Sequence, residues 1–253
     1  MFCAIMQPAF FPYLGYFDLI DSVDKFVFLD NVKLVKSYWP VRNKIKTDQG
    51  EIFLTVPVNT PQGGMNTMIN EAVIDQKGNW KKKHLKSLYF AYKKAAFFDE
   101  VYPFVEELYE IETDHLSEFN IEIIRRICAK IGLTKAMLKA SDLVGIRGLK
   151  DARLASICKN LDCDQYLSPQ GSIPYLEKES PGGELTKNNI IVFYQNFHHP
   201  VYPQCHDGFI SHLSCMDSFF NCGFSKSLEL IRGGHGQPIH CTECSFRTVK
   251  NTN

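Results

Sequence analysis

The sequence predicts an α/β fold with a Rossmann-like, mainly parallel sheet and a helical insertion. The N-terminal part shows a short apolar run, a loop, a helical segment and a second apolar run, which is the pattern of a βαβ unit. Three helical patterns follow near residues 77–133, and strand and helix patterns then alternate again. We therefore expect four parts: 1–76 and 134–231 as α/β parts, 77–133 as a helical insertion or subdomain, and 232–253 as a polar tail.

The first βαβ unit is the part most suggestive of a ligand site. Its expected strands, Phe2 to Met6 and Phe26 to Leu29, flank a helix at Gly15 to Asp21. In an open parallel sheet, ligands bind beyond the carboxyl ends of the strands. The polar and aromatic residues that follow the two strands are Gln7, Tyr13, Tyr16, Asp30 and Asn31.

The remaining elements are expected from residue spacing and from breakers. Glu51 to Val58 is typical of a strand, and Glu71 to Ile74 of a short one. The helical block contains Trp80 to Lys94, Val101 to Tyr109 and Leu116 to Ile131. The later elements are strands at Ala136 to Ala140, Gln165 to Ser168 and Asn189 to Tyr194, and helices at Leu149 to Leu161 and Ser214 to Asn221.

Composition excludes several functional classes. Lys+Arg and Asp+Glu number 28 each in 253 residues, so no basic excess indicates DNA binding. No apolar run reaches membrane-spanning length, and the N-terminus lacks a signal-peptide pattern, so we expect a cytoplasmic protein. We expect most of the nine cysteines to be buried, reduced thiols.

Aromatic and basic residues near position 40 are candidates for binding a ligand that has a ring and a phosphate group. Tyr13, Tyr16, Tyr38 and Trp39 have flat faces suited to stacking on a base or sugar ring, although aromatic residues are equally common in cores. Arg42 suits bidentate binding of a diphosphate, with Lys36, Lys44 and Lys46 adding charge. A solvated basic face is the alternative interpretation, and we favour it for the lysines.

Two residues are candidates for acid–base catalysis. Asp30 follows a strand directly, where a carboxylate can accept a proton, bind a ribose hydroxyl or cap a turn. His84 lies one helical turn from Trp80, where it is either a general acid or base or a hydrogen-bonded buried histidine.

A zinc site is a weaker candidate. Cys241 and Cys244 have half-site spacing, and Cys205 and His206 could complete it, but one Cys-x-x-Cys without a second pair is a weak signal. Cys205 is also a candidate nucleophile, with a nearby histidine as its base. Ser214 and Asp217 have the spacing of a helix capping box.

Several segments resemble one known family in a single order along most of the chain. They are Gln7-Pro8, Pro12 to Phe17, Phe28 to Val32, Arg42 to Lys46, Leu54 to Val58, Trp80 to His84, Tyr166 to Ser168, Pro200 to Gln204 and Leu213 to Gly223. They resemble the WbqC-like family of bacterial proteins, which often has tryptophan at the position of Tyr13. The resemblance adds Asn43, Tyr202 and Gln204 as candidate substrate contacts. The tail from Arg232 lies outside the resemblance.

A more distant similarity is to nucleotidylyltransferases, which carry a His-x-Gly-His element in the first loop. Here the corresponding run is Tyr13-Leu-Gly-Tyr16, without an imidazole, so chemistry that depends on those histidines is not expected.

The resemblance implies an enzyme of bacterial surface-polysaccharide (O-antigen, lipopolysaccharide) biosynthesis. Such an enzyme would transfer an aminoacyl group, such as glycyl, or an acyl group to a nucleotide-linked amino sugar. No cofactor is predicted, and the activated donor could be ATP-derived or an aminoacyl ester, with tRNA a partner only as such a donor. The alternatives are a non-catalytic protein that binds a nucleotide sugar or recruits a partner, and an adenylate-forming or nucleotidyl-transfer enzyme. A homo-oligomer is also compatible with the sequence.

Overall fold

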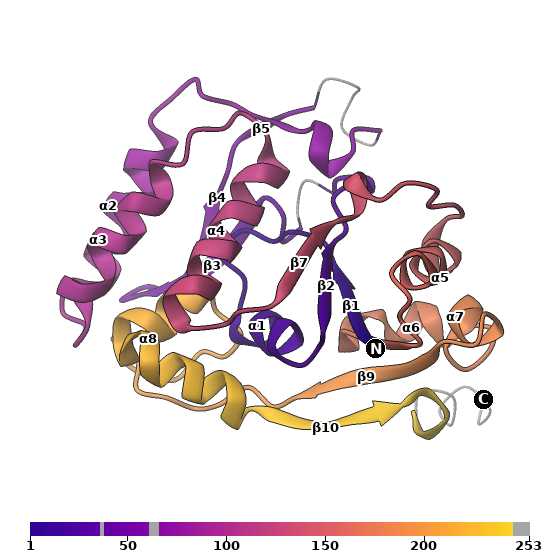
Figure 1. Cartoon of the computed structure of the whole chain (residues 1–253). Coiled ribbons are helices and arrows are strands. Elements are labelled where there is room, and N and C mark those ends of the chain that lie inside the picture. Colours follow the sequence, from indigo (N-terminus) through magenta and orange to yellow (C-terminus); the bar gives the residue numbers. More distant parts are fainter. Residues whose placement is uncertain (36–37, 61–65, 245–253) are drawn as a thin grey trace, which may run out of the picture.

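The computed structural model describes residues 1–35, 38–60 and 66–244, and its centre is a six-stranded sheet in the order β10-β9-β8-β1-β2-β7 (Figure 1). Neighbouring strands are parallel except at the edge pair β9–β10. The strands of this sheet are β1 (Phe2–Met6), β2 (Lys25–Phe28), β7 (Ala136–Lys139), β8 (Gln165–Ser168), β9 (Ile191–Phe197) and β10 (His235–His240). The predicted α/β class with a mainly parallel, Rossmann-like sheet is confirmed.

The strand order defines where a ligand crevice can form. From β1 the chain moves outward in one direction to β2 and β7, and it then returns to the other side of β1 to form β8 and β9. The direction of winding therefore reverses between β1 and β8. In doubly wound sheets this switch point, at the carboxyl ends of the strands, is the usual ligand site.

Helices cover both faces of the sheet (Figure 1). Alternate side chains of β1 show how the faces divide: Ala4 packs into one hydrophobic core and Cys3 and Ile5 into the other. The first core also contains residues of α1 (Leu14–Asp21), α2 (Trp80–Tyr92), α3 (Phe98–Tyr109), α4 (Leu116–Ile131) and α8 (Cys215–Gly233). The second contains residues of α5 (Lys150–Asn160), α6 (Ile173–Leu176) and α7 (Gly183–Lys187).

Two short antiparallel pairs lie outside the main sheet. They are β3 (Arg42–Thr47) with β4 (Gly50–Thr55), and β5 (Val58–Asn59) with β6 (Val73–Ile74). Residues of this region and of α2, α3 and α4 share the first core with α1, so the predicted helical insertion packs continuously with the N-terminal part.

The C-terminal quarter differs from the prediction in two ways. The last helix was expected to end at Asn221, but α8 continues to Gly233 after a kink at Gly223, whose φ is 78°. Only glycine adopts such a conformation readily, so Gly223 allows the helix to bend and continue beyond its expected end. The predicted tail is also not separate, because His235–His240 forms the edge strand β10. Residues 245–253 of that tail lie outside the described residues.

None of the helices among the described residues is both long and apolar enough to cross a membrane.

Candidate functional site

The carboxyl ends of β1, β2, β7 and β8 meet at one edge of the sheet, which we call the carboxyl edge. The register of the strands establishes this, since Met6 lies opposite Phe28 and Phe28 lies opposite Lys139. Gln7 and Asp30 are therefore among the first residues beyond the strands, as predicted. On the other side of β1, the chain leaves β8 through Pro169 into a short 3₁₀ helix, Gln170–Ser172.

The loop that follows β1, residues 7–13, is fixed by side chains from other elements. The Tyr16 hydroxyl donates to the Gln7 carbonyl at 3.0 Å, and Asn120 Nδ2 donates to the Pro8 carbonyl at 3.0 Å. Asn43 Nδ2 donates to the Phe11 carbonyl at 2.7 Å, and it is also 3.3 Å from the Phe10 carbonyl. These bonds hold the loop in one conformation, in which Phe11 has a φ of 42°. Because Tyr16 and Asn43 are buried, they act here as loop supports and not as exposed ligand contacts.

A second loop lies against the first. The Phe10 N–H donates to the Trp39 carbonyl at 2.9 Å, and Asn120 Nδ2 donates to the Pro40 carbonyl at 2.8 Å. In this loop the residues Tyr38 and Trp39 are 57% and 43% exposed. Two aromatic rings are thus displayed beside the loop that leaves β1. The predicted partner Lys36 lies outside the described residues.

At the end of β2, Asp30 is fully buried and joins two strands. Its Oδ1 accepts from the Ser141 backbone N–H at 2.9 Å, and its Oδ2 accepts from the Ser141 hydroxyl at 2.6 Å. The neighbouring Asn31 has a buried Oδ1 that no described residue hydrogen-bonds. Ser141 was not among the predicted site residues, although its place directly after the expected strand at Ala136 to Ala140 was a usable signal.

The predicted basic group does not gather at one point. The Arg42 guanidinium lies 4.3 Å from the centre of the Phe53 ring, on the β3–β4 hairpin. Lys44 forms an ion pair with Glu51 on the same hairpin. Lys46 is buried and donates to the carbonyls of His206 and Gly208. Of these three described residues, Arg42 is the half-buried one for which no ion pair is found among the described residues.

His84 lies inside an aromatic cluster of α2, α3 and α4. Its Nδ1 is 3.0 Å from the Tyr109 hydroxyl, and its ring packs edge-on against Trp80. Burial lowers the pKa of His84 to about 4, so the imidazole is neutral at pH 7. The position of His84 therefore agrees with the second interpretation, a hydrogen-bonded, buried histidine. An acid–base role stays a prediction.

Tyr202 and Gln204 point to a buried carboxylate. Tyr202 Oη donates to Asp217 Oδ2 at 3.0 Å and Gln204 Nε2 donates to the same oxygen at 2.7 Å, while Tyr92 Oη donates to Oδ1 at 2.9 Å. Burial raises the pKa of Asp217 despite these donors. Ser214 caps α8 by accepting from the Met216 N–H, as predicted, but Asp217 faces the core and does not complete a capping box.

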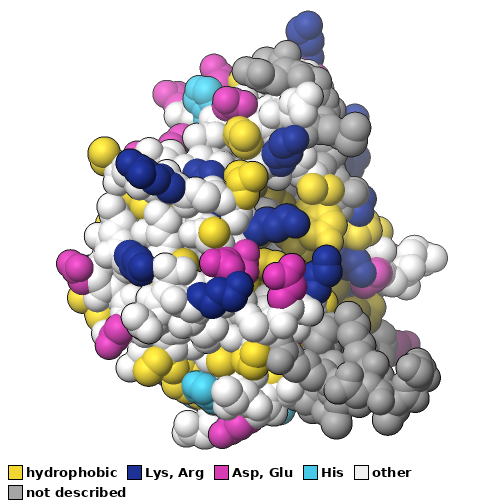
Figure 2. Space-filling model, turned by 90° about the vertical axis from the view of Figure 1, so that its right-hand side faces the viewer, with side chains coloured by type: hydrophobic (Ala, Val, Ile, Leu, Met, Phe, Trp, Pro, Cys, Tyr) yellow, Lys and Arg dark blue, Asp and Glu magenta, His cyan; other side chains and the backbone are white. Residues whose placement is uncertain are grey.

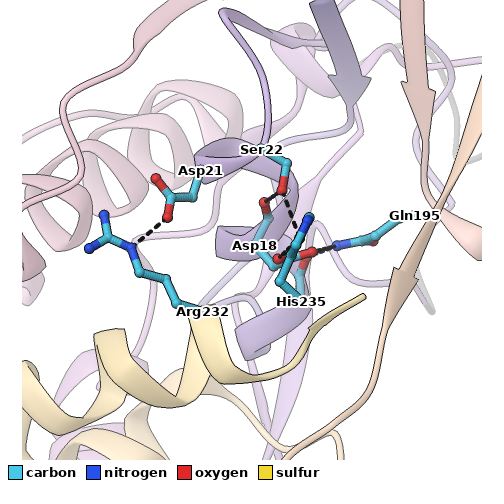
Figure 3. A network of polar contacts seen from close by, with 7 residues as sticks. Asp18, Asp21, Ser22, Gln195, Arg232 and His235 are labelled. Atoms are coloured by element: carbon cyan, nitrogen blue, oxygen red, sulfur yellow. Dashed lines mark hydrogen bonds and ion pairs between the residues drawn. The ribbon is translucent and has the colours of Figure 1, made fainter. Parts of the chain in front are cut away.

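Helix α1, which follows the first loop, is fixed against β9 and β10 (Figure 3). Asp18 is buried and accepts from Gln195 Nε2 at 2.6 Å, and it lies 2.9 Å from His235 Nδ1. Burial raises the pKa of this carboxyl. Arg232 pairs with Asp21 at 2.8 Å at the other end of the helix. These contacts give the helix N-terminus a defined position at the end of the first loop.

Two histidines that the prediction did not single out for this place lie beside Tyr13 at that N-terminus. The ring centres of Tyr13 and His212 are 5.7 Å apart, and those of His212 and His199 are 4.7 Å apart. His199 Nδ1 is 3.0 Å from the Pro200 carbonyl, which can only accept, so in neutral His199 this nitrogen carries the proton. Imidazoles from a distant segment thus flank a helix start whose own sequence has none.

The predicted zinc ligands do not come together. Cys205 packs against the first core, whereas Cys241 and Cys244 pack in the second, on the opposite face of the sheet. Among the described residues, no group of three or more His, Cys, Asp or Glu side chains is arranged to hold a metal ion.

Two cavities among the described residues are lined by other side chains than those of the first loop. One, of about 420 Å³, is lined by residues of α5, α6 and α7, including Lys150, Tyr175 and Glu184. The face that carries these helices mixes both signs of charge (Figure 2). The other, of about 410 Å³, is lined by Asp48, Lys93, Cys205 and His206, among others. Neither cavity includes Asp30 or His84, but the second includes Cys205, the candidate nucleophile, together with His206.

Comparison with known proteins extends these observations. The model of the WbqC-like protein family matches residues 7–228. The chain is 33% identical over 221 residues to the uncharacterized protein Rv1507c of Mycobacterium tuberculosis (strain ATCC 25618 / H37Rv), which covers 87% of this chain and 93% of the relative. No solved structure matches the chain significantly. The matched region contains both loops of the carboxyl edge and the segment around Asp217, and the chain therefore belongs to the WbqC-like protein family.

Proposed function

We propose that the carboxyl edge binds a nucleotide-linked amino sugar and that the protein transfers an aminoacyl or acyl group to it in bacterial surface-polysaccharide biosynthesis. The observation that carries the binding part is the fixed loop at residues 7–13, located at the switch point of a doubly wound sheet. A rigid loop loses little conformational entropy when a ligand binds, so its contacts contribute more fully to affinity.

The neighbouring residues supply the chemistry that such a ligand needs. The exposed rings of Tyr38 and Trp39 offer flat surfaces for a base or sugar ring. The buried Asn31 Oδ1, to which no described residue donates, can accept from a sugar hydroxyl or amine. Arg42 and the predicted Lys36 are the candidates for the diphosphate.

Catalysis adds a stricter requirement, because the amine must lose a proton as it attacks the donor. Asp30 is fully buried with both oxygens already accepting from Ser141, and His84 is buried and neutral. These two positions favour a second candidate function, a protein that holds a nucleotide sugar without catalysing transfer.

Binding is tested first by thermal unfolding with nucleotide-linked amino sugars, free nucleotides and ATP. A ligand that binds only the native protein raises the Tm. We expect the largest shift with a nucleotide-linked amino sugar and a smaller one in Trp39→Ala. Phe90→Ala is the matched control, because Phe90 is an aromatic residue of similar exposure, 56%, on α2. A shift with ATP alone would instead favour an adenylate-forming or nucleotidyl-transfer enzyme.

Turnover separates the two candidate functions. Asp30→Asn and His84→Gln are compared with the wild type for binding and for transfer from an adenylate or aminoacyl-ester donor. Lost transfer with retained binding supports the transferase. Tight binding by the wild type without transfer from any donor supports the binding protein.

A further inference from the structure

One ring nitrogen of His199 is buried and is hydrogen-bonded by no described residue. This nitrogen, Nε2, has almost no exposed surface, although the residue as a whole is partly exposed. The other nitrogen, Nδ1, donates to the Pro200 carbonyl, so in the neutral ring Nε2 keeps its lone pair and can only accept. A buried acceptor without a donor costs free energy, so its presence in a folded protein needs an explanation.

The polar rings that neighbour His199 are engaged with other groups. The ring centres of His212 and Tyr202 lie 4.7 and 6.1 Å from that of His199. The Tyr202 hydroxyl donates to Asp217, and His212 Nδ1 lies 2.9 Å from the Ser211 hydroxyl. Neither of these groups supplies a donor to His199 Nε2.

His199 lies at the carboxyl edge of the sheet. It follows β9, which is parallel to β8. In their register Ser168, the last residue of β8, lies opposite Tyr194, so β9 continues beyond the end of β8 before the chain reaches His199. His199 is therefore on the same edge of the sheet as the first loop.

The start of α1 lies beside the pair formed by His199 and His212. Gln195 Nε2 donates to the Gly15 carbonyl at 2.7 Å, which fixes β9 to the first turn of α1. The Tyr13 ring is 5.7 Å from that of His212, and it lies so close to Gly15 that a Cβ there would collide with it. Glycine at this position therefore allows the Tyr13 ring to lie against the helix and next to the two histidines.

The histidine pair lies close to the surface. The ring of Phe209 is 6.1 Å from that of His199, and Phe209 is 38% exposed. His212 is exposed as well. His199 Nε2 is thus covered in part by side chains that reach solvent.

The charge state of His199 limits which groups it can bind. Burial, with a contribution from His212, lowers the pKa of His199 to about 4, so the ring is neutral at pH 7. A neutral Nε2 pairs with an N–H or O–H group, whereas an ionised phosphate oxygen has no proton to donate. Of the parts of a nucleotide-linked amino sugar, the amine and the hydroxyls of the sugar fit this position and the diphosphate does not.

We propose that His199 Nε2 accepts a hydrogen bond from the amine or a hydroxyl of the sugar ring, beside Tyr13. This inference rests on the proposed binding of a nucleotide-linked amino sugar at the carboxyl edge, and it names the residue that holds the sugar end. The N–H or O–H of the ligand supplies the donor that the described residues do not give to Nε2.

NMR of the full chain with isotope-labelled histidine nitrogens observes this atom directly. The signals of His199 are identified by their loss in His199→Asn. In the free protein the proton should be on Nδ1, and a proton on Nε2 would overturn the proposal, because that nitrogen could then not accept. UDP-glucosamine, used as the probe, should shift the Nε2 signal, whereas UDP, which lacks the sugar, should not. An equal shift with UDP would overturn the assignment to the sugar.

Binding to variants is the second measurement. His199→Asn keeps an amide N–H for the Pro200 carbonyl and removes Nε2, so the loop retains this support. UDP-glucosamine should bind this variant about tenfold more weakly, and UDP should bind it unchanged. The control is His198→Asn, the same substitution at the exposed neighbour, which should bind both probes as the wild type does.

The inference and the proposed function fail in different ways. If UDP-glucosamine raises the Tm but neither shifts the Nε2 signal nor binds His199→Asn more weakly, the role of His199 is wrong and the proposed function stands. If no nucleotide-linked amino sugar raises the Tm, the proposed function is wrong and the inference falls with it.

Discussion

Residues 7–13 and residues 198–212 are two loops that leave parallel strands, β1 and β9, at their carboxyl ends. In the first loop the backbone carbonyls accept from side chains of other elements, chiefly Tyr16, Asn43 and Asn120. In the second, the side chains of Tyr202 and Gln204 turn inward to Asp217. The first loop is held by side chains of other elements, whereas the second loop is held by its own polar side chains, which bind a carboxylate in the core.

This difference separates loops that can present a site from loops that maintain the fold. A polar side chain on a supported loop stays available for a ligand, because the backbone bonds already fix the loop. A polar side chain that satisfies a buried carboxylate cannot leave without exposing that charge to an apolar environment. Tyr202 and Gln204 therefore have a structural role here, while the first loop and Trp39 are the places to look for ligand contacts.

The largest effect should come from the second loop. Asp217→Ala leaves three buried donors without their acceptor, so we expect the free energy of unfolding to fall by at least about 3 kcal/mol. Chemical denaturation measures this loss. Tyr202→Phe, which removes one donor and keeps the ring, should cost only about 1 kcal/mol. Equal losses would mean that Asp217 does not organise the loop.

Low pH should destabilise the folded protein through His84, whose ring centre lies 5.9 Å from that of Phe10 in the first loop. The pKa of His84 is about 4 in the folded protein and about 6.5 in the unfolded chain, so only the unfolded chain takes up this proton between those values. Neutral His84 therefore contributes up to about 3 kcal/mol to the free energy of unfolding. This contribution is fully present above pH 6.5 and is lost as the pH falls toward 4. Denaturation at several pH values checks this against His84→Gln, whose pH dependence should be weaker. A variant with an unchanged pH dependence would contradict it.

Removing one support of the first loop should have an intermediate effect. Asn43→Ala deletes the donor to the Phe10 and Phe11 carbonyls, at a cost of about 2 kcal/mol. Asn59→Ala, at an exposed position on β5, is the control and should change stability by less than about 0.5 kcal/mol. If the two variants unfold alike, the first loop does not depend on Asn43.

The smallest effect on stability should come from the exposed ring beside the first loop. Trp39→Ala is expected to alter the free energy of unfolding by less than about 0.5 kcal/mol, because the residue is 43% exposed. A loss comparable to that of Asn43→Ala would show that the ring is part of the core and not a free binding surface.

The sequence predicted the parts of the fold that carry strong apolar periodicity. The α/β class, the first βαβ unit and the bounds of α4, Leu116–Ile131, agree with the structure. The strand β3 was missed because its residues alternate in charge and polarity without an apolar run. The strand β10 was missed because Gly236 and Pro238 mark loops in most sequences, whereas an edge strand tolerates them.

The candidate site was less predictable because side-chain direction is a tertiary property. Gln7 and Asp30 follow strands, and the sequence indicated that directly. Nothing in the sequence near Asn43 shows that its amide reaches the Phe11 carbonyl, and nothing near His212 shows that it lies beside Tyr13. Such pairings depend on how separate elements pack, so they appear only once the fold is known.

Hydrogen exchange with mass spectrometry tests the central claim most directly. The protein is compared with and without the nucleotide-linked amino sugar that raises the Tm most. If the carboxyl edge is the site, slowed exchange should be concentrated in peptides covering residues 7–13 and 38–42. Slowed exchange confined to residues 150–187, around the cavity between α5, α6 and α7, would contradict the assignment and place the ligand on the other face of the sheet.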